Sequence, residues 1–245
     1  MTVDYNHQAT KWHRDSSGPY GDFCGRPEIF NIIKTLGKEK TILDVGCGEG
    51  YFSRKIADIS NHVVGVDLSR EMIYLAVERE KQEKRGIKYH IGNAKDMSFL
   101  TDSTFDLCVG NYIANYFKPD ELPQFYKELG RVIKDNGRFV LLMTHPVFEL
   151  ITDYGEAMQY EIDEYDYIKS RGKLFKAQLR TVQGNVLETG LYHSTLEDHF
   201  DAIAHAGLKV NKIKEPVFPQ ELSEKYPIFS KMGGKVVCMI LVGEK

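Results

Sequence analysis

The residues best suited to chemistry form a glycine-rich turn after a short apolar run. Gly46, Gly48 and Gly50 follow the apolar segment 41–45. Glycine has no side chain, so this turn lets the backbone approach a ligand closely. Asp67 ends the next apolar run, 21 residues after Gly46. A carboxylate there can accept hydrogen bonds from both hydroxyls of a ribose. Together the two features predict a site for an adenosine-containing cofactor.

The spacing and charge of the turn indicate which adenosine cofactor is bound. The dinucleotide fingerprint places its third glycine three residues after the second, whereas Gly50 is two after Gly48. Asp44 stands just before the turn. Its carboxylate would repel a pyrophosphate and attract the ammonium or sulfonium of S-adenosylmethionine. We therefore expect S-adenosylmethionine, with S-adenosylhomocysteine as product, and keep a nicotinamide-dependent dehydrogenase as an alternative.

Methyl transfer from such a cofactor is an in-line displacement, and an oxygen, nitrogen or carbon acceptor can require a general base. His145 lies two residues after the apolar run 139–143, at the sheet edge where ligands bind. His193 ends a segment just before a helix. Both are candidate catalytic bases, and the alternative is a solvated or capping role. Tyr112 is expected to form a wall of the pocket.

The elements that must position these residues alternate between strand and helix. A helical apolar stripe over 122–133 that stops near Asn136-Gly137, and helices starting at Ser69 and Thr195, separate the apolar runs. This order predicts an α/β fold with a doubly wound, mainly parallel seven-stranded sheet and helices on both faces. The expected strands are 41–45, 62–66, 87–91, 105–109, 139–143, 208–213 and 236–242.

We predict a single domain over 1–245, with a cap segment at 1–36 and an inserted lid at 146–194. The cap includes a helix over 26–36. The lid contains a hairpin whose strands, 175–182 and 186–193, flank Gln183-Gly184-Asn185. Within it, residues 152–168 carry six acidic groups and four tyrosines. That composition would suit a cationic acceptor, and the alternative is a solvated acidic loop whose tyrosines belong to the core.

Several segments resemble the motifs of class I (Rossmann-like) S-adenosylmethionine-dependent methyltransferases. ILDVGCGEG resembles the first motif and VVGVDLS the second. IGNAKDMSF resembles the third, with Asn93 where the family usually has aspartate; an amide oxygen accepts the same hydrogen bond. FDLCVGNYIANYF resembles the fourth motif, and LGRVIKDNGRFVLLM the helix and strand that follow it. The match covers about 41–145, with a looser one over 192–210.

This resemblance implies a set of cofactor contacts. The glycine turn would line the methionine and ribose, Asp67 would bind the ribose hydroxyls, and Asn111 with Tyr112 would close over the methionine. Trp12, His13 and Tyr20 lie in a segment that related enzymes often fold over the cofactor. The implied contacts are Gly46, Cys47, Gly48, Gly50, Asp67, Leu68, Met72, Asn93, Ala94, Asn111 and Tyr112.

The composition of the chain argues for some classes of binding partner and against others. The net charge of −3 argues against nucleic acid as partner, and no Asn-Pro-Pro-Tyr motif follows the fourth strand. We therefore expect a small-molecule acceptor, with an RNA or protein methyltransferase and a non-catalytic cofactor-binding module as alternatives. The four cysteines are expected to be reduced and mostly buried, no metal site is expected, and the polar start predicts a cytoplasmic enzyme without a leader.

Overall fold

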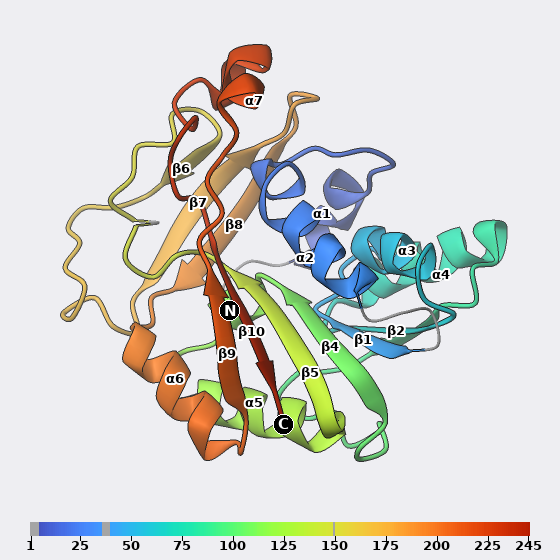
Figure 1. The fold of residues 1–245 in the computed structure, drawn as a ribbon. Helices are drawn as coiled ribbons and strands as arrows, with labels where there is room; N and C mark the ends of the chain where they lie inside the picture. The colour runs from blue at the N-terminus through green and yellow to red at the C-terminus, as the bar shows by residue number, and fades with distance from the viewer. Residues whose placement is uncertain (1–4, 36–39, 149) are drawn as a thin grey trace.

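The computed structural model describes residues 5–35, 40–148 and 150–245, and its centre is a seven-stranded sheet (Figure 1). The strand order is β3-β2-β1-β4-β5-β10-β9. Every neighbouring pair is parallel except the two that involve β10. This confirms the predicted mainly parallel sheet. The strands are β1 (Thr41–Val45), β2 (His62–Asp67), β3 (Lys88–Ile91), β4 (Phe105–Asn111), β5 (Ile133–Met143), β9 (Lys209–Lys214) and β10 (Met239–Glu244).

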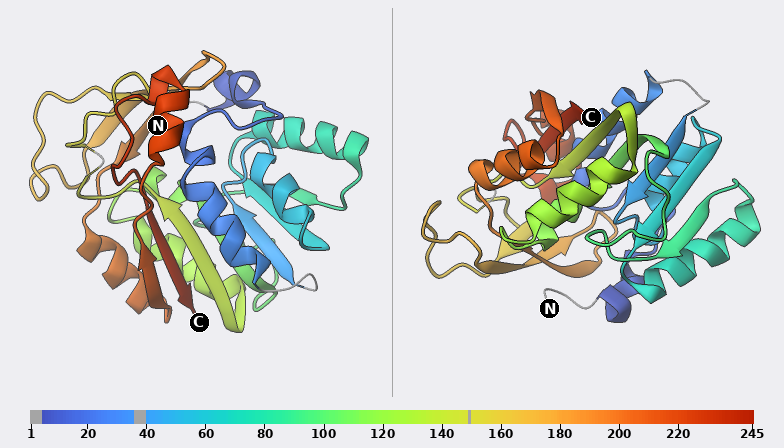
Figure 2. Two further views of the ribbon diagram at one scale, coloured as in Figure 1. Left: turned by 45° about the horizontal axis from the view of Figure 1, so that its top comes forward. Right: turned by 90° about the horizontal axis from the view of Figure 1, so that it is seen from below.

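Helices cover both faces of this sheet, as Figure 2 shows from below. On one face, α2 (Gly25–Lys34) and α3 (Tyr51–Ala57) bury Ile29, Ile33, Phe52 and Ile56 against β1, β4 and β5. On the other, α5 (Leu122–Val132) and α6 (Leu196–His205) pack on Leu43, Cys108 and Leu141. Adjacent strand residues point to opposite faces, so the apolar strands supply both cores. The capping box predicted at Thr195 is present. The helix α4 (Arg70–Glu83) packs on β2 and β3.

Several predicted boundaries were wrong: the last strand, expected over 236–242, is Met239–Glu244, and the largest error lies between α5 and β5. The stripe over 122–133 was expected to stay helical up to Asn136-Gly137, but α5 ends at Val132 and β5 begins at Ile133. The carbonyl groups of Arg131 and Val132 accept hydrogen bonds from the N–H groups of Ser103 and Thr104, and Ile133 then pairs with Phe105. Tertiary hydrogen bonds therefore end this helix earlier than its apolar pattern does. Leu36, the last residue of the helix predicted over 26–36, lies outside the described residues, as do residues 1–4 of the expected cap.

A second, antiparallel sheet has the order β6-β7-β8 and lies above the carboxyl ends of the parallel strands (Figure 1). It consists of β6 (Met158–Tyr160), β7 (Leu174–Arg180) and β8 (Val186–Tyr192), and β7 with β8 forms the predicted hairpin. The N-terminal helix α1 (Tyr5–Trp12) contacts both α4 and β8. The shorter elements are η1 (Tyr20–Asp22), η2 (Ile113–Tyr116), α7 (Gln220–Lys225) and η3 (Pro227–Phe229). Among the described helices, none has the length and apolar character needed to cross a bilayer.

Candidate functional site

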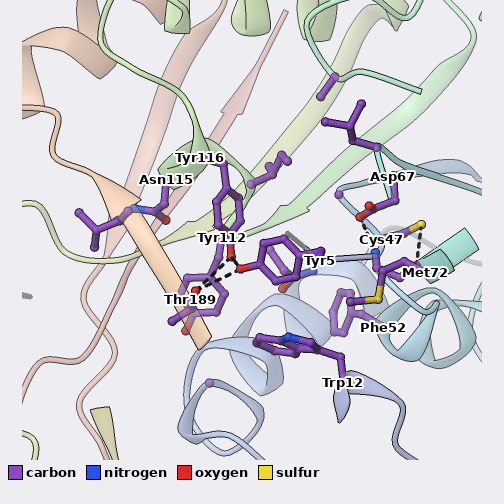
Figure 3. Close-up of a pocket in the computed structure, with 18 of the residues that line it drawn as sticks. Tyr5, Trp12, Cys47, Phe52, Asp67, Met72, Tyr112, Asn115, Tyr116 and Thr189 are labelled. Carbon is purple, nitrogen blue, oxygen red and sulfur yellow. Dashed lines mark hydrogen bonds between the residues drawn. The ribbon is translucent and has the colours of Figure 1, made fainter. Parts of the chain in front are cut away.

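A cavity of about 560 Å³ lies at the carboxyl edge of β1, β2 and β4. Its other walls are α1, η2 and the second sheet, so segments far apart in the chain enclose it (Figure 3). In open α/β sheets this edge is where ligands bind. A volume of this size suits a small-molecule ligand.

The glycine turn forms the floor of the cavity. Gly46, Gly48 and Gly50 all have positive φ angles, which glycine adopts without strain. The N–H groups of Gly46 and Cys47 both donate to the carbonyl of Val66, at 2.7 and 3.0 Å, so the turn is fixed to β2. A Cβ atom on Gly46 would stand 2.9 Å from Ile113 Cδ1, whereas one on Gly48 would meet no atom within 4 Å. The turn is therefore packed on one side and open to the cavity at Gly48.

Asp67 ends β2 beside this turn. Its Oδ2 accepts a hydrogen bond from the Gly48 N–H at 2.8 Å, and its Oδ1 accepts one from the Ser69 N–H at 2.9 Å. Burial raises the pKa of Asp67, and these two backbone donors oppose the rise. Each carboxylate oxygen has a further lone pair available for a ligand hydroxyl.

Asp44 is buried at the end of β1 and is only partly satisfied. Its Oδ2 accepts a 2.6 Å hydrogen bond from Ser53 Oγ, while its Oδ1 has no hydrogen-bond partner among the described residues. Burial raises the pKa of Asp44 to about 6, against the opposing effects of Ser53 and the positive charge of Arg26. A buried carboxylate oxygen without a partner is costly, so this group is poised to bind a cation or a donor.

Other polar side chains that line the cavity also have unsatisfied atoms, Asn111 and Arg26 among them. Both amide atoms of Asn111 are buried without a hydrogen-bond partner, within the part of the chain that is described, and so is Nε of Arg26. The Nη1 of Arg26 donates to Asp22 at 2.7 Å, and its guanidinium lies 5.6 Å from the centre of the Tyr112 ring. Tyr112 has φ = 63°, a strained conformation for a tyrosine, and its N–H donates to the Leu142 carbonyl at 2.6 Å.

The residues expected to contact an adenine line the opposite part of the cavity wall. Met72 and Ala94 are buried, whereas Leu68 is 70% exposed. The Asn93 side-chain oxygen already accepts a 3.0 Å hydrogen bond from the Lys95 N–H. That bond orients the amide and leaves the oxygen one lone pair. All four of these residues line the cavity.

The two candidate catalytic histidines lie elsewhere. His145 is buried, but its Nε2 contacts Glu215 Oε1 at 2.9 Å and its Nδ1 accepts from the N–H groups of Val147 and Phe148. His193 contacts the Tyr167 carbonyl at 2.8 Å through Nε2, and burial lowers its pKa. Neither lines the cavity. Both histidines contact neighbouring segments of the chain, and the catalytic role expected of them stays a prediction.

Three hydroxyl groups from three separate elements meet at the cavity wall. Tyr5 of α1, Tyr116 of η2 and Thr189 of β8 form what we call the hydroxyl cluster (Figure 3). Tyr5 Oη lies 2.5 Å from Tyr116 Oη and 3.1 Å from Thr189 Oγ1, and the latter two oxygens are 3.4 Å apart. Burial raises the pKa of both tyrosines, so they stay protonated at neutral pH. The cluster joins the N-terminal segment to the core and to the second sheet.

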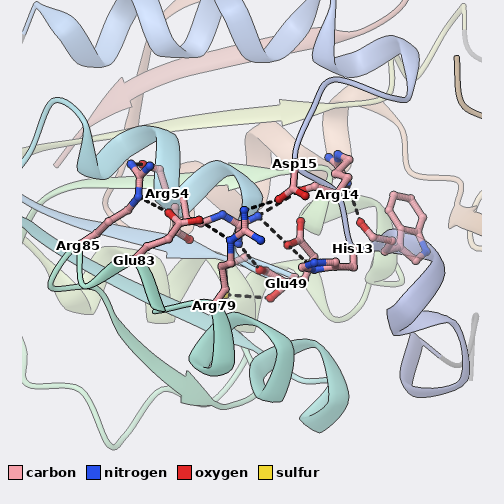
Figure 4. Close-up of polar contacts among 12 residues, drawn as sticks. His13, Arg14, Asp15, Glu49, Arg54, Arg79, Glu83 and Arg85 are labelled. Atoms are coloured by element: carbon pink, nitrogen blue, oxygen red, sulfur yellow. Dashed lines mark hydrogen bonds and ion pairs between the residues drawn. The ribbon is translucent and has the colours of Figure 1, made fainter. Parts of the chain in front are cut away.

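The N-terminal segment also contacts the glycine turn and the loop between β2 and α4, which both line the cavity. Ser69 Oγ donates to Asn6 Oδ1 at 2.8 Å, just after Asp67. His13 Nδ1 lies 3.6 Å from Glu49 in the glycine turn (Figure 4). Asp15 forms an ion pair with Arg79 of α4 (Figure 4). The N-terminal segment therefore lies across both loops, and the expectation that it folds over a cofactor stays a prediction.

Residues 152–168 contribute little to the cavity. Of its tyrosines, Tyr160 lines the cavity, and Tyr154 is buried 6.3 Å from the ring of Tyr20 in a stacked arrangement. Asp153 pairs with Lys231 at 2.7 Å. None of the six acidic groups in this fully described stretch lines the cavity. These positions match the alternative of a solvated acidic loop with core tyrosines.

The structure therefore brings together all the predicted cofactor residues except Gly50, which lies behind the turn against Tyr89. Sequence reasoning missed Arg26 and the hydroxyl cluster. No motif marks them, because Tyr5, Arg26 and Thr189 reach the cavity from elements whose packing the local pattern does not specify. Arg26 had one signal, an arginine on the buried side of a short helix beside Asp22.

Known proteins resemble this chain in sequence and in fold. Residues 42–137 match the family described as a methyltransferase domain. The chain is 28% identical over 179 residues to phosphoethanolamine N-methyltransferase 2 of Caenorhabditis elegans, covering 71% of this chain and 38% of that protein. It is 30% identical over 107 residues to a ubiquinone biosynthesis O-methyltransferase of Hydrogenovibrio crunogenus, covering 42% and 44%. The chain thus spans about two fifths to a half of the curated relatives it matches.

The fold is similar over almost the whole chain to solved methyltransferases. The CcbJ methyltransferase from Streptomyces caelestis superposes with a TM-score of 0.68 at 15% identity, over 98% of this chain and 96% of that one. At such low identity the likeness shows the fold, which is the class I methyltransferase fold. The structural similarity extends to the segments before residue 42 and after residue 137.

Proposed function

We propose that this chain, which belongs through residues 42–137 to the methyltransferase-domain family, transfers a methyl group from S-adenosylmethionine to a small-molecule acceptor. The observation that carries the proposal is a set of unsatisfied buried polar groups in one cavity with Asp67. Asp44 Oδ1, Arg26 Nε and the Asn111 amide have no partner among the described residues. Such groups are rare in folded proteins, and a polar ligand bound in the cavity would satisfy them.

The charges of these groups fit the amino-acid end of S-adenosylmethionine. The Asp44 carboxylate would face the ammonium group, and Arg26 would face the carboxylate. The two side chains are close enough for the Arg26 charge to oppose the rise in the Asp44 pKa. Asn111 can donate and accept there. A pyrophosphate would find Asp44 repulsive, which argues against the dehydrogenase alternative.

The rest of the cofactor would lie along β2. Asp67 would accept hydrogen bonds from the ribose hydroxyls on the lone pairs that Gly48 and Ser69 leave free. Met72 and Leu68 would pack against the adenine. The Asn93 oxygen would accept from the adenine amino group, and the Ala94 N–H would donate to the ring. This is a proposed set of contacts, and the binding experiments below test it.

When bound, S-adenosylmethionine supplies a methyl carbon activated by the sulfonium, and the C–S electron pair returns to sulfur as the acceptor's lone pair forms the new bond. The protein's contribution is to hold the acceptor in line and to exclude water. The second sheet and α1 are placed for both tasks, because Met158, Leu179 and Trp12 cover the cavity. We propose that residues 146–194 act as a lid and that the N-terminal segment acts as a cap.

The enclosure favours a small acceptor over RNA or protein. The cavity lining includes Lys95 and Lys118, but Lys95 is paired with Glu121, and the net charge is −3. The relatives named above, which methylate phosphoethanolamine or act in ubiquinone biosynthesis by their names, point the same way. A cytoplasmic location belongs to this proposal.

Transfer of a labelled methyl group tests the function. The protein is incubated with methyl-labelled S-adenosylmethionine and three separate pools: small phenols and amines, total RNA, and total protein. We expect label in the small-molecule pool alone, and none with Asp67→Ala. Label in RNA or protein would favour the macromolecular alternative. Cofactor binding with no transfer to any pool would favour a non-catalytic binding module.

A further inference from the structure

The hydroxyl cluster has more hydrogen-bond acceptors than donors. Tyr5, Tyr116 and Thr189 bring one O–H proton each, and the three contacts among them can use all three protons. Each oxygen can still accept at least one bond from elsewhere. Both tyrosines remain protonated and uncharged at neutral pH, because burial raises the pKa of each. The cluster therefore offers neutral acceptor positions inside the cavity, and a ligand that donates an O–H or N–H satisfies them.

Aromatic and apolar side chains surround these hydroxyls. The Tyr5 ring meets Tyr116 edge-on, with centroids 5.5 Å apart, and lies 5.9 Å from the Trp12 ring. Met158, Leu179 and Leu191 complete the cavity wall from the second sheet. Such walls favour a flat or apolar molecular body, with the polar group fixing its orientation.

We infer that the hydroxyl cluster is the acceptor subsite, and that it selects small aromatic acceptors carrying a hydrogen-bond donor, a hydroxyl or an amine. The inference rests on the proposed function, since it assigns this part of the cavity to the acceptor. The cluster is built by the cap, the core and the second sheet together, so it is complete when all three are in place. Acceptor binding thereby requires the closed arrangement that also excludes water.

The test measures binding of four probes of similar size by saturation-transfer NMR, with S-adenosylhomocysteine present. Phenol and aniline carry a donor, anisole carries an acceptor without a donor, and toluene carries neither. We expect phenol and aniline to bind about fivefold to tenfold more tightly than anisole and toluene, as one hydrogen bond predicts. Equal affinity for phenol and anisole, or no binding of any probe, would overturn the inference. A preference for aniline over phenol, or the reverse, identifies which donor the subsite takes.

Variants that remove one hydroxyl connect this preference to the cluster. Tyr116→Phe and Thr189→Val keep the shape of the side chain, and each should reduce the phenol-to-anisole ratio to near unity. Tyr192→Phe is the matched control, because Tyr192 lines the same cavity from β8 but is not part of the cluster. It should leave the ratio as in the wild type.

The same samples separate this inference from the proposed function. If the cluster binds the acceptor, Tyr116→Phe and Thr189→Val should leave the affinity for S-adenosylhomocysteine unchanged. If they weaken that affinity and leave the phenol-to-anisole ratio intact, the cluster belongs to the cofactor site and the inference is wrong. Failure of the wild-type protein to bind S-adenosylhomocysteine would contradict the proposed function instead, and the probe ratios can still be measured without it.

Discussion

At the scale of single residues, the protonation of Asp44 makes the stability of the protein depend on pH. Its folded-state pKa of about 6 lies above the ordinary value of 3.8. The folded protein therefore binds this proton more tightly than the unfolded chain. Between about pH 4 and pH 6, the free energy of unfolding falls as pH rises, by about 3 kcal/mol in total. A cationic ligand group beside Asp44 favours the ionised carboxylate, so ligand binding restores part of the lost free energy of unfolding.

We predict that the affinity for S-adenosylhomocysteine increases as pH rises from about 5 to about 7, because Asp44 ionises over that interval. Asp44→Asn should bind more weakly and lose most of this pH dependence. Calorimetric titration at several pH values measures both effects. An unchanged pH profile in Asp44→Asn would show that another group, such as Asp67, controls the binding.

A second prediction concerns Arg26. If its guanidinium binds the carboxylate of the methionine moiety, Arg26→Gln should reduce the affinity for S-adenosylhomocysteine by about tenfold or more. That is the contribution of a charge-assisted hydrogen bond. The affinity for 5′-methylthioadenosine should not change, because that molecule has neither the carboxylate nor the ammonium.

Arg14→Gln is the control for Arg26, since Arg14 donates to the same Asp22 carboxylate at 3.2 Å. It reproduces the loss of one Asp22 partner while keeping the Arg26 guanidinium. If Arg26→Gln reduces the affinities for S-adenosylhomocysteine and 5′-methylthioadenosine equally, Arg26 supports the shape of the site and makes no contact with the carboxylate.

At the scale of elements, one side chain joins the start of α4 to the N-terminal helix. Ser69 accepts a hydrogen bond from the Met72 N–H at 3.2 Å as an N-cap, and donates to Asn6. Ser69→Ala should cost about 1 kcal/mol of stability through the lost cap. It should also increase hydrogen exchange in residues 5–12 and speed the dissociation of S-adenosylhomocysteine.

Thr195→Ala provides the comparison. Thr195 caps α6 in the same way, accepting from the Asp198 N–H at 3.2 Å, and among the described residues its side chain hydrogen-bonds to Asp198 alone. It should lose similar stability without changing exchange in residues 5–12. If both variants alter that exchange equally, the effect is global, and α1 is not held by its bond to the α4 cap.

The sequence predicted the regular elements better than the segments that enclose the site. β1 and the α6 cap lie where their local patterns place them, because apolar runs and capping residues act over a few positions. The helix α1 was not predicted, since its eight residues carry no clear stripe and it depends on contacts with α4 and β8. Tyr5 was not predicted for the same reason, because it belongs to α1. A local pattern also could not reveal that His145 would be engaged by Glu215, 70 residues later.

At the scale of the whole molecule, the strand order and the glycine turn create one edge where β1, β2 and β4 end together. The α2 helix, the N-terminal segment and the second sheet then bring charge, hydroxyls and apolar cover to that edge. The order of elements in the sequence predicted this sheet, because right-handed crossovers leave few arrangements for alternating strands and helices. The contents of the cavity depend on long-range packing.

The central claim is that this edge binds S-adenosylmethionine, and calorimetric titration tests it most directly. The purified protein is titrated with S-adenosylmethionine, S-adenosylhomocysteine and NAD, alongside Asp67→Ala, whose thermal unfolding confirms that it is folded. The account predicts binding of both sulfur compounds at micromolar concentration, loss of that binding in Asp67→Ala, and no binding of NAD. Binding of NAD, or failure of the wild-type protein to bind either sulfur compound, would contradict it.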